Sequence, residues 1–489
     1  MAPASREELE RLLKEERARS EKLERSNERL EKKLDEMLER QSELQQQIKD
    51  LMRKLTEALR AAKRQANPFA RRVRKQCRKK PGRKAGHPGA YQAVPDHVDQ
   101  ESFEPLSSCP CCGGDVDDVT DHEQFVVDLP KVRAHVHRIV TQSGHCGRCR
   151  RRVRSRHPDQ VSTAAGAASV ALGPNVLGLA ADLKHRYGMA YRKIADLIAT
   201  YFGIRITHGA FVQSSLRLAK LGEVTYLALI ATLRASPVVH TDDTGWRIDG
   251  ESTWLWVFAT EAVTVYVVAR SRGSAVVLGV LGVEFAGTLV SDGLPALDAL
   301  DDIYTRAQCL GHLIVRASEL AALHKAGAAR MPLAVKGLLQ DVIALRGCRD
   351  DLAASTYRRK CRGVEQRLDR LLAGHSTVTE NEKLRRHMTK HRDQLRVTLD
   401  DPAVPPTNNL AEQRLRGAVV VRKLGGCNRS DEHAWAHAVL ASVAQTAHCQ
   451  DFTFTDFVRG WLRPRAGPED ALRAIAPDPT VTPRVQHRC

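Results

Sequence analysis

A heptad pattern near the start of the chain commits a long stretch of sequence to one extended helix. From residue 9 to residue 62, the seam positions follow one another in alternating steps of four and three residues, which is the a and d spacing of a coiled coil. Leucines at d positions include Leu9, Leu23, Leu30, Leu44 and Leu51. At about 1.5 Å per residue, such a helix would be roughly 80 Å long, too extended to fold back onto a globular core without a break.

Asn27 falls at an a position of this seam. A pair of buried amides at such a position favours a parallel two-stranded coiled coil, at some cost in stability. We therefore predict a dimerisation arm over residues 1–66. A single solvated, charged helix is the alternative.

A basic segment follows the arm. Asn67-Pro68 should end the helix, and the Pro and Gly residues of 67–100 oppose regular structure, so we predict a linker. The chain of 489 residues carries a formal net charge of +18, which favours a polyanionic partner such as nucleic acid. The linker residues predicted to contact DNA phosphates are Arg71, Arg72, Arg78, Lys79, Lys80, Arg83 and Lys84. A role in solvation is the plainer alternative, because a basic run by itself discriminates weakly.

Two cysteine pairs predict a structural zinc site in residues 101–160. Cys109 and Cys112 form one CxxC pair, and Cys146 and Cys149 form the second. Four such thiolates complete a tetrahedral zinc site of the ribbon type. Reduced cysteines without metal are the alternative.

The surroundings of the cysteines leave the ligand set slightly open. Cys111 is a competing thiol, and four histidines could replace a ligand: His122, His135, His137 and His145. Between the pairs, apolar residues alternate over 125–129 and 132–136, as in two strands joined at Pro130. Arg148 and residues 150–152 surround the second pair, so this side of the module is predicted to face DNA.

Residues 161–235 have the apolar spacing of helices. The segment 190–197 and a second segment that starts near Thr207 would lie on either side of a short turn at 203–206. Two helices joined in this way fit a helix-turn-helix unit, whose second helix enters a DNA groove. An ordinary helical connector fits the same pattern.

Four apolar runs and one helical run predict a mixed sheet over residues 236–312. Three strand-like runs, at 237–240, 253–259 and 263–270, precede a helix at 274–283 and a fourth strand at 287–291. This order describes a ribonuclease-H-like layout. Asp242 follows the first strand and Asp292 the fourth, so they would lie side by side if those strands are neighbours. A simple turn at Asp292-Gly293 is the alternative for the second residue.

The rest of the chain completes the core. Residues 313–401 are helix-rich and charged and are predicted to be a helical insertion, which prolines at 402, 405 and 406 would stop. Thr407 or Asn408 can then cap a helix within a segment, 402–465, that carries Glu412 in its first turns. A pairing of Glu412 with Arg416 one turn later is the structural alternative. The expected fold is therefore a multidomain α+β protein.

Asp242, Asp292 and Glu412 together predict a metal centre. Hard divalent cations such as Mg²⁺ or Mn²⁺ take carboxylate oxygens, and a metal pair can activate an attacking oxygen and stabilise the leaving one during displacement at phosphorus. His312 is expected to support this centre. Four basic residues near Glu412 would hold phosphates: Arg414, Arg416, Arg422 and Lys423.

The ordered motifs resemble the transposases of the IS66 insertion-sequence family, of the class with an acidic DDE triad. The resemblance covers nearly the whole chain. Its segments are the amino-terminal zipper, 82–89, the two CxxC pairs, 240–245, 291–293, 309–312, 408–416, 422–423 and 428–430. It implies that Asp242, Asp292 and Glu412 are the metal-binding catalytic residues.

The chain departs from the family pattern beside the acidic residues. It has Asp243 where the family usually has Glu, Leu294 where it generally has Tyr, and Gln413 where it often has Arg. We prefer Asp242 to Asp243 as the catalytic residue, from its alignment with His240 and Thr244. The departures leave room for an altered or decayed copy of an element.

The resemblance implies a DNA transposase that cuts at element ends with Mg²⁺ or Mn²⁺ and joins the freed 3′-hydroxyls to target DNA. Expected partners are double-stranded DNA, a second copy of the chain and companion proteins of the element, without a membrane. The competing function is a catalytically inactive DNA-binding regulator, and a structure-specific nuclease is more distant. Residues 1–50 lack the apolar core of a signal peptide, so we expect a bacterial cytoplasmic protein. The Pro-rich tail, 466–489, is predicted to be disordered.

Overall fold

The computed structural model describes residues 94–130, 132–161, 170–324 and 327–462, together with most residues between 14 and 48. The chain divides into two units, residues 1–127 and 128–489, and each is described by itself. The predicted DNA-contacting residues between Arg71 and Lys84, and the predicted disordered tail, lie outside the described residues. Among the helices that are described, none combines the length and apolar character needed to cross a membrane.

In the first unit, every described residue between 14 and 48 is helical. The seam residues Leu34, Met37, Leu44 and Ile48 are between 53% and 70% exposed. An apolar stripe on a lone helix has no core of its own to bury against. The helix is thus present in this part, and its pairing with a second copy stays a prediction.

The two strands predicted on either side of Pro130 are wrong. The described residues of 121–142 have neither helix nor strand. Val126, Leu129 and Val136 are more than 80% exposed. Alternating apolar residues form a strand when one face packs on something, and these side chains face solvent. The strands lie instead beside the second cysteine pair, where β1 (Ser143–His145) runs antiparallel to β2 (Arg152–Arg154).

The helices that lie directly before the sheet in the sequence are α2 (Pro174–His185), α3 (Tyr191–Phe202) and α4 (His208–Arg234). Ile194 and Ile198 of α3 are buried with Ala180 of α2 and Phe211 of α4. Gly203 ends α3 with a φ of +69°, and the hydroxyl of Thr207 accepts the Ala210 N–H at 3.3 Å to start α4. Two helices around a short turn are therefore present, as predicted, and α2 gives them a small shared core.

The central sheet has the strand order β5-β4-β3-β6-β7. Its elements are β3 (Val238–Ile248), β4 (Glu251–Ala259), β5 (Thr264–Ala269), α5 (Ser274–Leu281), β6 (Thr288–Ser291), η1 (Pro295–Leu300) and β7 (Thr305–Gln308). β3 is antiparallel to β4 and parallel to β6. The first and fourth predicted strands are therefore neighbours, which is the condition under which Asp242 and Asp292 would lie side by side, and the sheet is mixed as predicted.

β3 is longer than predicted, so Asp242 lies within the strand and not at its end. The strand continues to Ile248, where Asp249-Gly250 turns the chain directly into β4. Both turn residues have positive φ, +49° and +82°. This is the conformation that an Asp-Gly pair favours in a two-residue hairpin.

Helices cover both faces and one edge of the sheet. They include α4, α11 (Asn409–Gly425) and α12 (Asp431–Cys449), and α13 (Phe454–Leu462) packs against α2 and α4. On one face, Leu255 and Val257 pack with Leu415 of α11. On the other, Trp256 and Phe258 belong to a larger core that includes residues of α4 and α12. Ser442 and Thr446 of α12 accept the outward N–H groups of β5 at 2.8 and 3.0 Å, which closes that edge.

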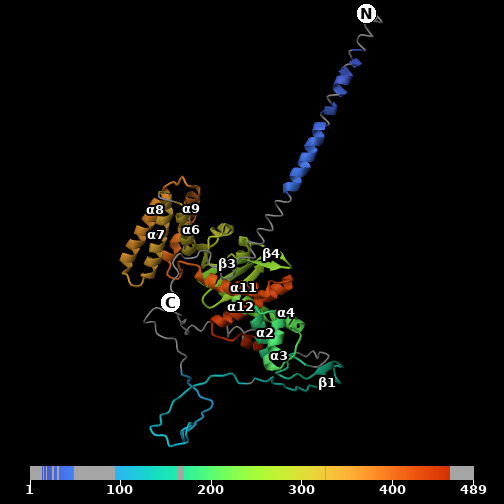
Figure 1. Ribbon diagram of the computed structural model, residues 1–489, viewed down its shortest axis with the longest axis vertical. Helices are drawn as coiled ribbons and strands as arrows, with labels where there is room; N and C mark the ends of the chain where they lie inside the picture. Colours follow the sequence, from blue (N-terminus) through green and yellow to red (C-terminus); the bar gives the residue numbers. More distant parts are fainter. Residues whose placement is uncertain are drawn as a thin grey trace, which may run out of the picture. The chain divides into compact units, whose positions relative to one another are not determined.

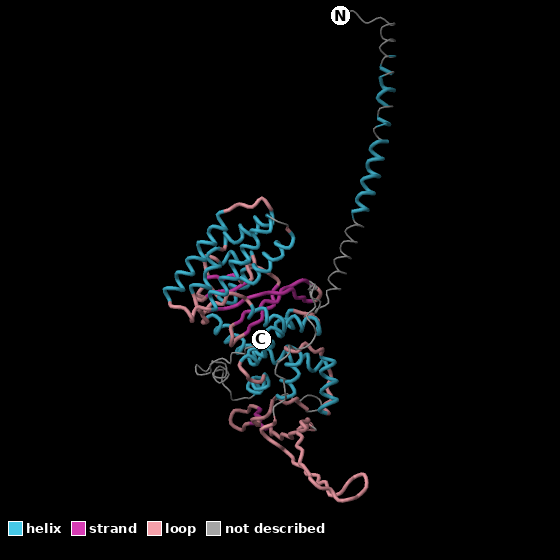
Figure 2. Tube along the Cα trace, turned by 60° about the vertical axis from the view of Figure 1, so that its left-hand side comes forward, coloured by secondary structure: helices cyan, strands magenta, loops and turns pink. Residues whose placement is uncertain are grey.

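Residues 310–400 form a helical body with a core of its own. It contains α6 (Leu310–Leu323), α7 (Gly327–Gly347), α8 (Ala354–Ala373), α9 (Thr379–Lys390) and α10 (Arg392–Asp400). Leu313 of α6, Leu338 of α7 and Leu368 of α8 belong to one buried cluster. Figures 1 and 2 show the sheet between this body and the group of α2, α3 and α4. Because α6 follows β7 directly and α11 follows α10 after a short turn, both ends of the body return to the sheet.

Candidate active site

Asp242 and Asp292 lie on one face of the sheet. The parallel pairing of β3 and β6 matches His240 with Val290, and each aspartate comes two residues later. Side chains alternate along a strand, so His240 and Asp242 share a face. Asp292 comes directly after β6, and its charge helps to raise the pKa of Asp242, so the two carboxylates are close. Val257, the cross-strand partner of Asp242, packs with α11. The face that carries the two aspartates is therefore the one that α11 covers.

Asp243 points to the opposite face. Its cross-strand partner is Trp256, which belongs to the other core. Oδ2 of Asp243 lies 2.9 Å from Nε of Arg272, whose guanidinium stacks over Trp254 at 4.5 Å. Because a shift of one residue changes the face, Asp242 and Asp243 cannot exchange roles without a change of register.

Glu412 is in the first turn of α11, and Asn408 fixes the start of that helix. Oδ1 of Asn408 lies 3.0 Å from Nδ1 of His240, and Nδ2 donates to the carbonyl of Thr241 at 2.8 Å. Asn408 is fully buried. Of the two predicted capping residues, Thr407 and Asn408, it is Asn408 that occupies the N-cap position, but its side chain makes no capping bond. Its side chain instead ties α11 to β3, next to Asp242.

His312 lies among the three carboxylates. It is in the first turn of α6, and its Nδ1 is 3.8 Å from Oε1 of Glu412. A hydrogen bond with Cys309 raises the pKa of His312 to about 9, and the negative charges of Glu412 and Asp292 add to this effect. These interactions favour the protonated, positively charged form of the ring beside the acidic residues.

The electrostatics of Asp242 show a crowded acidic site. Burial, together with the charges of Asp292 and Asp243, raises its pKa to about 7, although an Asp243 N–H and His312 act in the opposite direction. A carboxylate in this situation gains from a nearby cation. The oxygen donors of Asp242, Asp292 and Glu412 are those that Mg²⁺ and Mn²⁺ prefer, so this donor set fits the predicted metals.

The Asp292 loop depends on a contact that the sequence did not indicate. Gly293 has a φ of +83°, and a Cβ there would lie 1.9 Å from Nε2 of Gln308. The same Nε2 is 2.6 Å from Nε2 of His387 in α9. β7, which carries Gln308, was not predicted, because Thr-Arg-Ala-Gln is short and polar and has no strand signal.

The basic residues of α11 divide into two pairs. Nη1 of Arg422 donates to the Thr244 hydroxyl at 3.0 Å and to the carbonyl of Gly245. Nη2 of Arg414 donates to the carbonyl of Glu261 at 3.3 Å. Arg416 and Lys423 are exposed. The first pair thus anchors α11 to the sheet, and the second faces solvent.

The two cysteine pairs form matching turns, each in its own unit. The N–H of Cys109 donates to Gly114 and the N–H of Gly113 to Cys109, at 2.9 and 2.8 Å. The corresponding bonds at the second pair, from Cys146 to Arg151 and from Arg150 to Cys146, have the same lengths. The residue after each second cysteine has positive φ, +75° at Gly113 and +55° at Arg150. N–H groups that point at sulfur lower the pKa of Cys109 and of Cys146.

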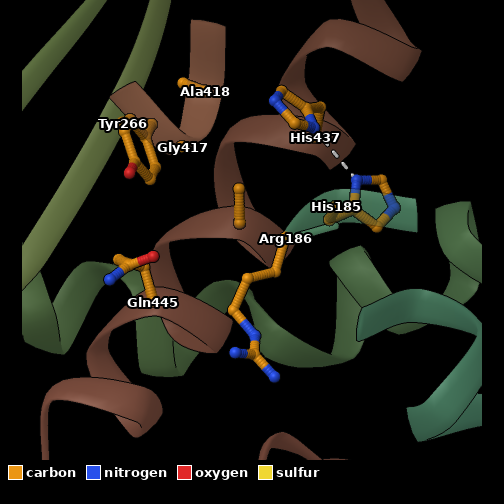
Figure 3. Close-up of a pocket in the computed structure, with 8 residues that line it drawn as sticks. His185, Arg186, Tyr266, Gly417, Ala418, His437 and Gln445 are labelled. Carbon is orange, nitrogen blue, oxygen red and sulfur yellow. Dashed lines mark hydrogen bonds between the residues drawn. The ribbon is translucent and has the colours of Figure 1, made fainter. Parts of the chain in front are cut away.

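A small cavity between α2, α11 and α12 contains none of the predicted catalytic residues (Figure 3). Nδ1 of His185 lies 3.0 Å from Nδ1 of His437, and Trp246 stacks on His437 at 5.2 Å. The cavity measures about 10 Å³, which is too small for a substrate and enough for a single water. This site is structural.

One comparison with known proteins gives a match. The model of the family described as "Transposase IS66 family" matches residues 169–436, more than half of the chain. The match runs from the residues before α2 into α12 and includes Asp242, Asp292 and Glu412. A search of curated proteins finds no match.

Proposed function

The chain belongs to the IS66 family of transposases, and we propose that it cuts DNA at the ends of an insertion sequence and joins the freed ends to target DNA. The observation that supports this activity is the convergence of Asp242, Asp292 and Glu412 on one face of the sheet, beneath the start of α11. A mixed sheet with this strand order is compatible with a DDE-type core.

Asp242, Asp292 and Glu412 would hold Mg²⁺ or Mn²⁺. When bound, a pair of these ions activates the attacking oxygen and stabilises the leaving oxygen of an in-line displacement. The chain itself positions the three carboxylates. β3 and β6 set two carboxylates in register, and Asn408 holds the helix that carries the third. One acidic site can serve both steps, because only the nucleophile changes from water to a DNA hydroxyl.

His312 would orient Glu412 and offset the negative charge of the site. Its protonated ring lies 3.8 Å from that carboxylate and interacts with Asp292. Because the metals can activate the attacking oxygen themselves, we assign His312 a positioning role and not that of a general base.

DNA contacts are proposed on several surfaces. Arg416 and Lys423 are exposed on α11 and would bind phosphates. His208, Gln213 and Arg217 are exposed on the first turns of α4, the second helix of the proposed helix-turn-helix. Binding through phosphates should weaken as salt increases, because it depends on counterion release.

We also propose one structural zinc ion held by Cys109, Cys112, Cys146 and Cys149. Support comes from the matched turns, since both present two sulfurs with the same backbone hydrogen bonds. Purified full-length protein should contain zinc that is lost in Cys112→Ser and in Cys149→Ser, measured by metal analysis. Equal zinc in these variants and the wild type would refute the ligand set.

Dimerisation through the arm would bring two element ends together. The exposed seam residues Leu34 and Leu44 support this part of the proposal. The full chain should sediment as a dimer, and Leu34→Glu with Leu44→Glu should convert it to a monomer, because two charges would enter the seam. A wild-type chain that sediments as a monomer would contradict the dimer.

The deciding experiment is a cleavage and strand-transfer assay on DNA carrying element ends, with Mg²⁺ or Mn²⁺. Asp242→Asn, Asp292→Asn and Glu412→Gln should each abolish both steps. Glu432→Gln, an exposed residue of α12 that pairs with Lys220, is the control. Activity in the three variants equal to the wild type would refute the site.

A second candidate, an inactive regulator that only occupies element ends, is favoured by the departures at Asp243, Leu294 and Gln413. It predicts that the wild type binds end DNA and cleaves none of it, with or without the companion proteins of the element. The same assay, read for binding and for cleavage, separates the two candidates.

A further inference from the structure

Cys309, His312 and Glu412 bring three different ligand atoms together. One sulfur, one nitrogen and one carboxylate oxygen lie within 4.8 Å of one another. We propose that these residues bind a soft divalent transition metal such as Zn²⁺, and that this binding inhibits the enzyme by taking Glu412 from the Mg²⁺ centre. The inhibition rests on the proposed function, whereas the zinc site itself does not.

The fold builds this site from the starts of two helices. Cys309 is the N-cap residue of α6 and is 1% exposed, and His312 lies one turn later on the same helix. Glu412 is in the first turn of α11. The backbone N–H of Asn408, at the start of α11, donates to Sγ of Cys309 at 3.1 Å. Helix N-termini carry partial positive charge, which favours a thiolate over a thiol.

The distance between the ligand atoms of His312 and Glu412 is close to that around a tetrahedral ion. Zinc bonds of about 2.0–2.2 Å to nitrogen and oxygen place those two atoms about 3.4 Å apart. Nδ1 of His312 and Oε1 of Glu412 are 3.8 Å apart, so a small side-chain movement suffices. The side chains of His312 and Glu412 are 47% and 33% exposed, which leaves a path for the ion and a fourth position for water.

The ligand chemistry distinguishes this site from the carboxylate centre. A thiolate and an imidazole select zinc-like ions, whereas Mg²⁺ takes oxygen ligands. Both sites would use Glu412, and a zinc ion bonded to its carboxylate would hold that side chain away from the Mg²⁺ centre. Zinc at the Cys309 site therefore removes a ligand that the proposed reaction needs.

A second group of acidic and histidine side chains provides a contrast. Asp298, Asp301 and His391 also lie close together, but positive side chains already occupy that cluster. Nζ of Lys390 is 2.7 Å from Asp298, and the buried guanidinium of Arg306 contacts both aspartates. By contrast, in the described parts of the chain Glu412 forms its ion pair with His312, and not with a lysine or an arginine.

The binding test counts zinc in the full-length protein. Wild type and variants are dialysed against a zinc buffer of fixed free Zn²⁺, and bound zinc is measured by metal analysis. Cys309→Ser should hold about one equivalent less than the wild type, because the thiolate ligand is lost. Cys361→Ser, a half-buried cysteine of α8, should match the wild type. Cys112→Ser should lose the proposed ribbon zinc and keep this one.

Binding of cobalt provides a second test of the same site. Co²⁺ bound to a thiolate has a charge-transfer absorption, and the difference between wild type and Cys309→Ser should show it. His312→Gln should lose the same equivalent of zinc while Cys309 stays in place. This second variant keeps the test valid if Cys309→Ser does not fold. Wild-type zinc content in folded Cys309→Ser and in His312→Gln would overturn the proposal.

The inhibition test compares each protein with itself. The ratio of strand transfer with and without added Zn²⁺, at fixed Mg²⁺, should fall for the wild type, and Cys309→Ser should need at least about tenfold more zinc for the same fall. Equal sensitivity would refute inhibition through this site. If the wild type cleaves no DNA with Mg²⁺ and no added zinc, the proposed function is refuted. The measurement of bound zinc then still tests whether the Cys309 site exists.

Discussion

Nδ1 of His240 lies 3.0 Å from Oδ1 of Asn408, and this contact joins strand β3 to the start of α11. His240 comes two residues before Asp242, and Asn408 comes four before Glu412. Two carboxylates from distant parts of the sequence are thus held by one buried pair. The distance between the proposed catalytic residues depends on residues that would contact neither metal nor DNA.

Asn408→Ala should lower the free energy of unfolding by about 1–3 kcal/mol, because it leaves the buried His240 ring and the Thr241 carbonyl without partners. It should also lower the cleavage rate, since Glu412 loses its fixed position. Urea unfolding and the cleavage assay measure the two effects. The control is Asn409→Ala, an exposed neighbour, which should change stability by less than about 0.5 kcal/mol. Equal effects of the two substitutions would show that the His240 contact is unimportant.

Asp242→Asn and Asp243→Asn should differ strongly in activity. Asp242 is on the face of α11 and Asp243 is paired with Arg272 on the other face. Loss of a metal-binding carboxylate should reduce the rate by roughly a thousandfold or more, equivalent to about 4 kcal/mol of the activation barrier. Asp243→Asn should reduce it by less than about tenfold. The reverse ranking, measured in one cleavage assay, would move the catalytic role to Asp243.

Gly293→Ala should destabilise the protein by about 2 kcal/mol and slow cleavage. Gly293 has a positive φ that costs alanine about 1 kcal/mol, and the added methyl group would displace Gln308. Gly337→Ala, in the open middle of α7, should stabilise by about 0.5–1 kcal/mol because alanine favours helix. Thermal unfolding of both variants checks the two signs. A neutral Gly293→Ala would mean that the Asp292 loop does not need this backbone conformation.

The buried His185–His437 pair should make the protein sensitive to acid. Burial lowers the pKa of His437 from 6.5 to about 3 and lowers that of His185 as well. Below pH 6.5 the unfolded chain binds protons that the folded chain does not, so the free energy of unfolding falls as the pH falls from 6.5 towards 3. Each such proton contributes up to about 1.4 kcal/mol per pH unit.

His437→Gln tests this dependence, because it removes one of the two buried titrating groups. Its unfolding free energy should change less steeply between pH 6.5 and 5 than that of the wild type, measured by urea unfolding at each pH. His448→Gln, an exposed residue of the same helix, should keep the wild-type slope. Parallel slopes in wild type and His437→Gln would assign the acid sensitivity to other histidines, such as His387, whose pKa burial also lowers, to about 4.

The sheet illustrates what pattern alone can predict. Apolar runs indicated β4, β5, α5 and β6, because buried strands and helices need continuous or periodic apolar residues. The same reasoning missed β7, where Thr-Arg-Ala-Gln forms a strand through its pairing with β6. It also assigned strands around Pro130, where the apolar side chains have nothing to pack on.

The sequence by itself determined which residues we propose for the chemistry. Asp242, Asp292 and Glu412 were indicated by local motifs and by the family resemblance, and the cysteine pairs by their spacing. Only the tertiary structure decided how they meet. The register of β3 with β6 set the two aspartates on one face, and the side chain of Asn408, expected to cap a helix, bound β3 instead. Cys309 and His312 came to lie against Glu412 in the same way. Such contacts join residues that are far apart in the sequence, up to 168 positions for His240 and Asn408. Packing selects them, so no local pattern could have shown them.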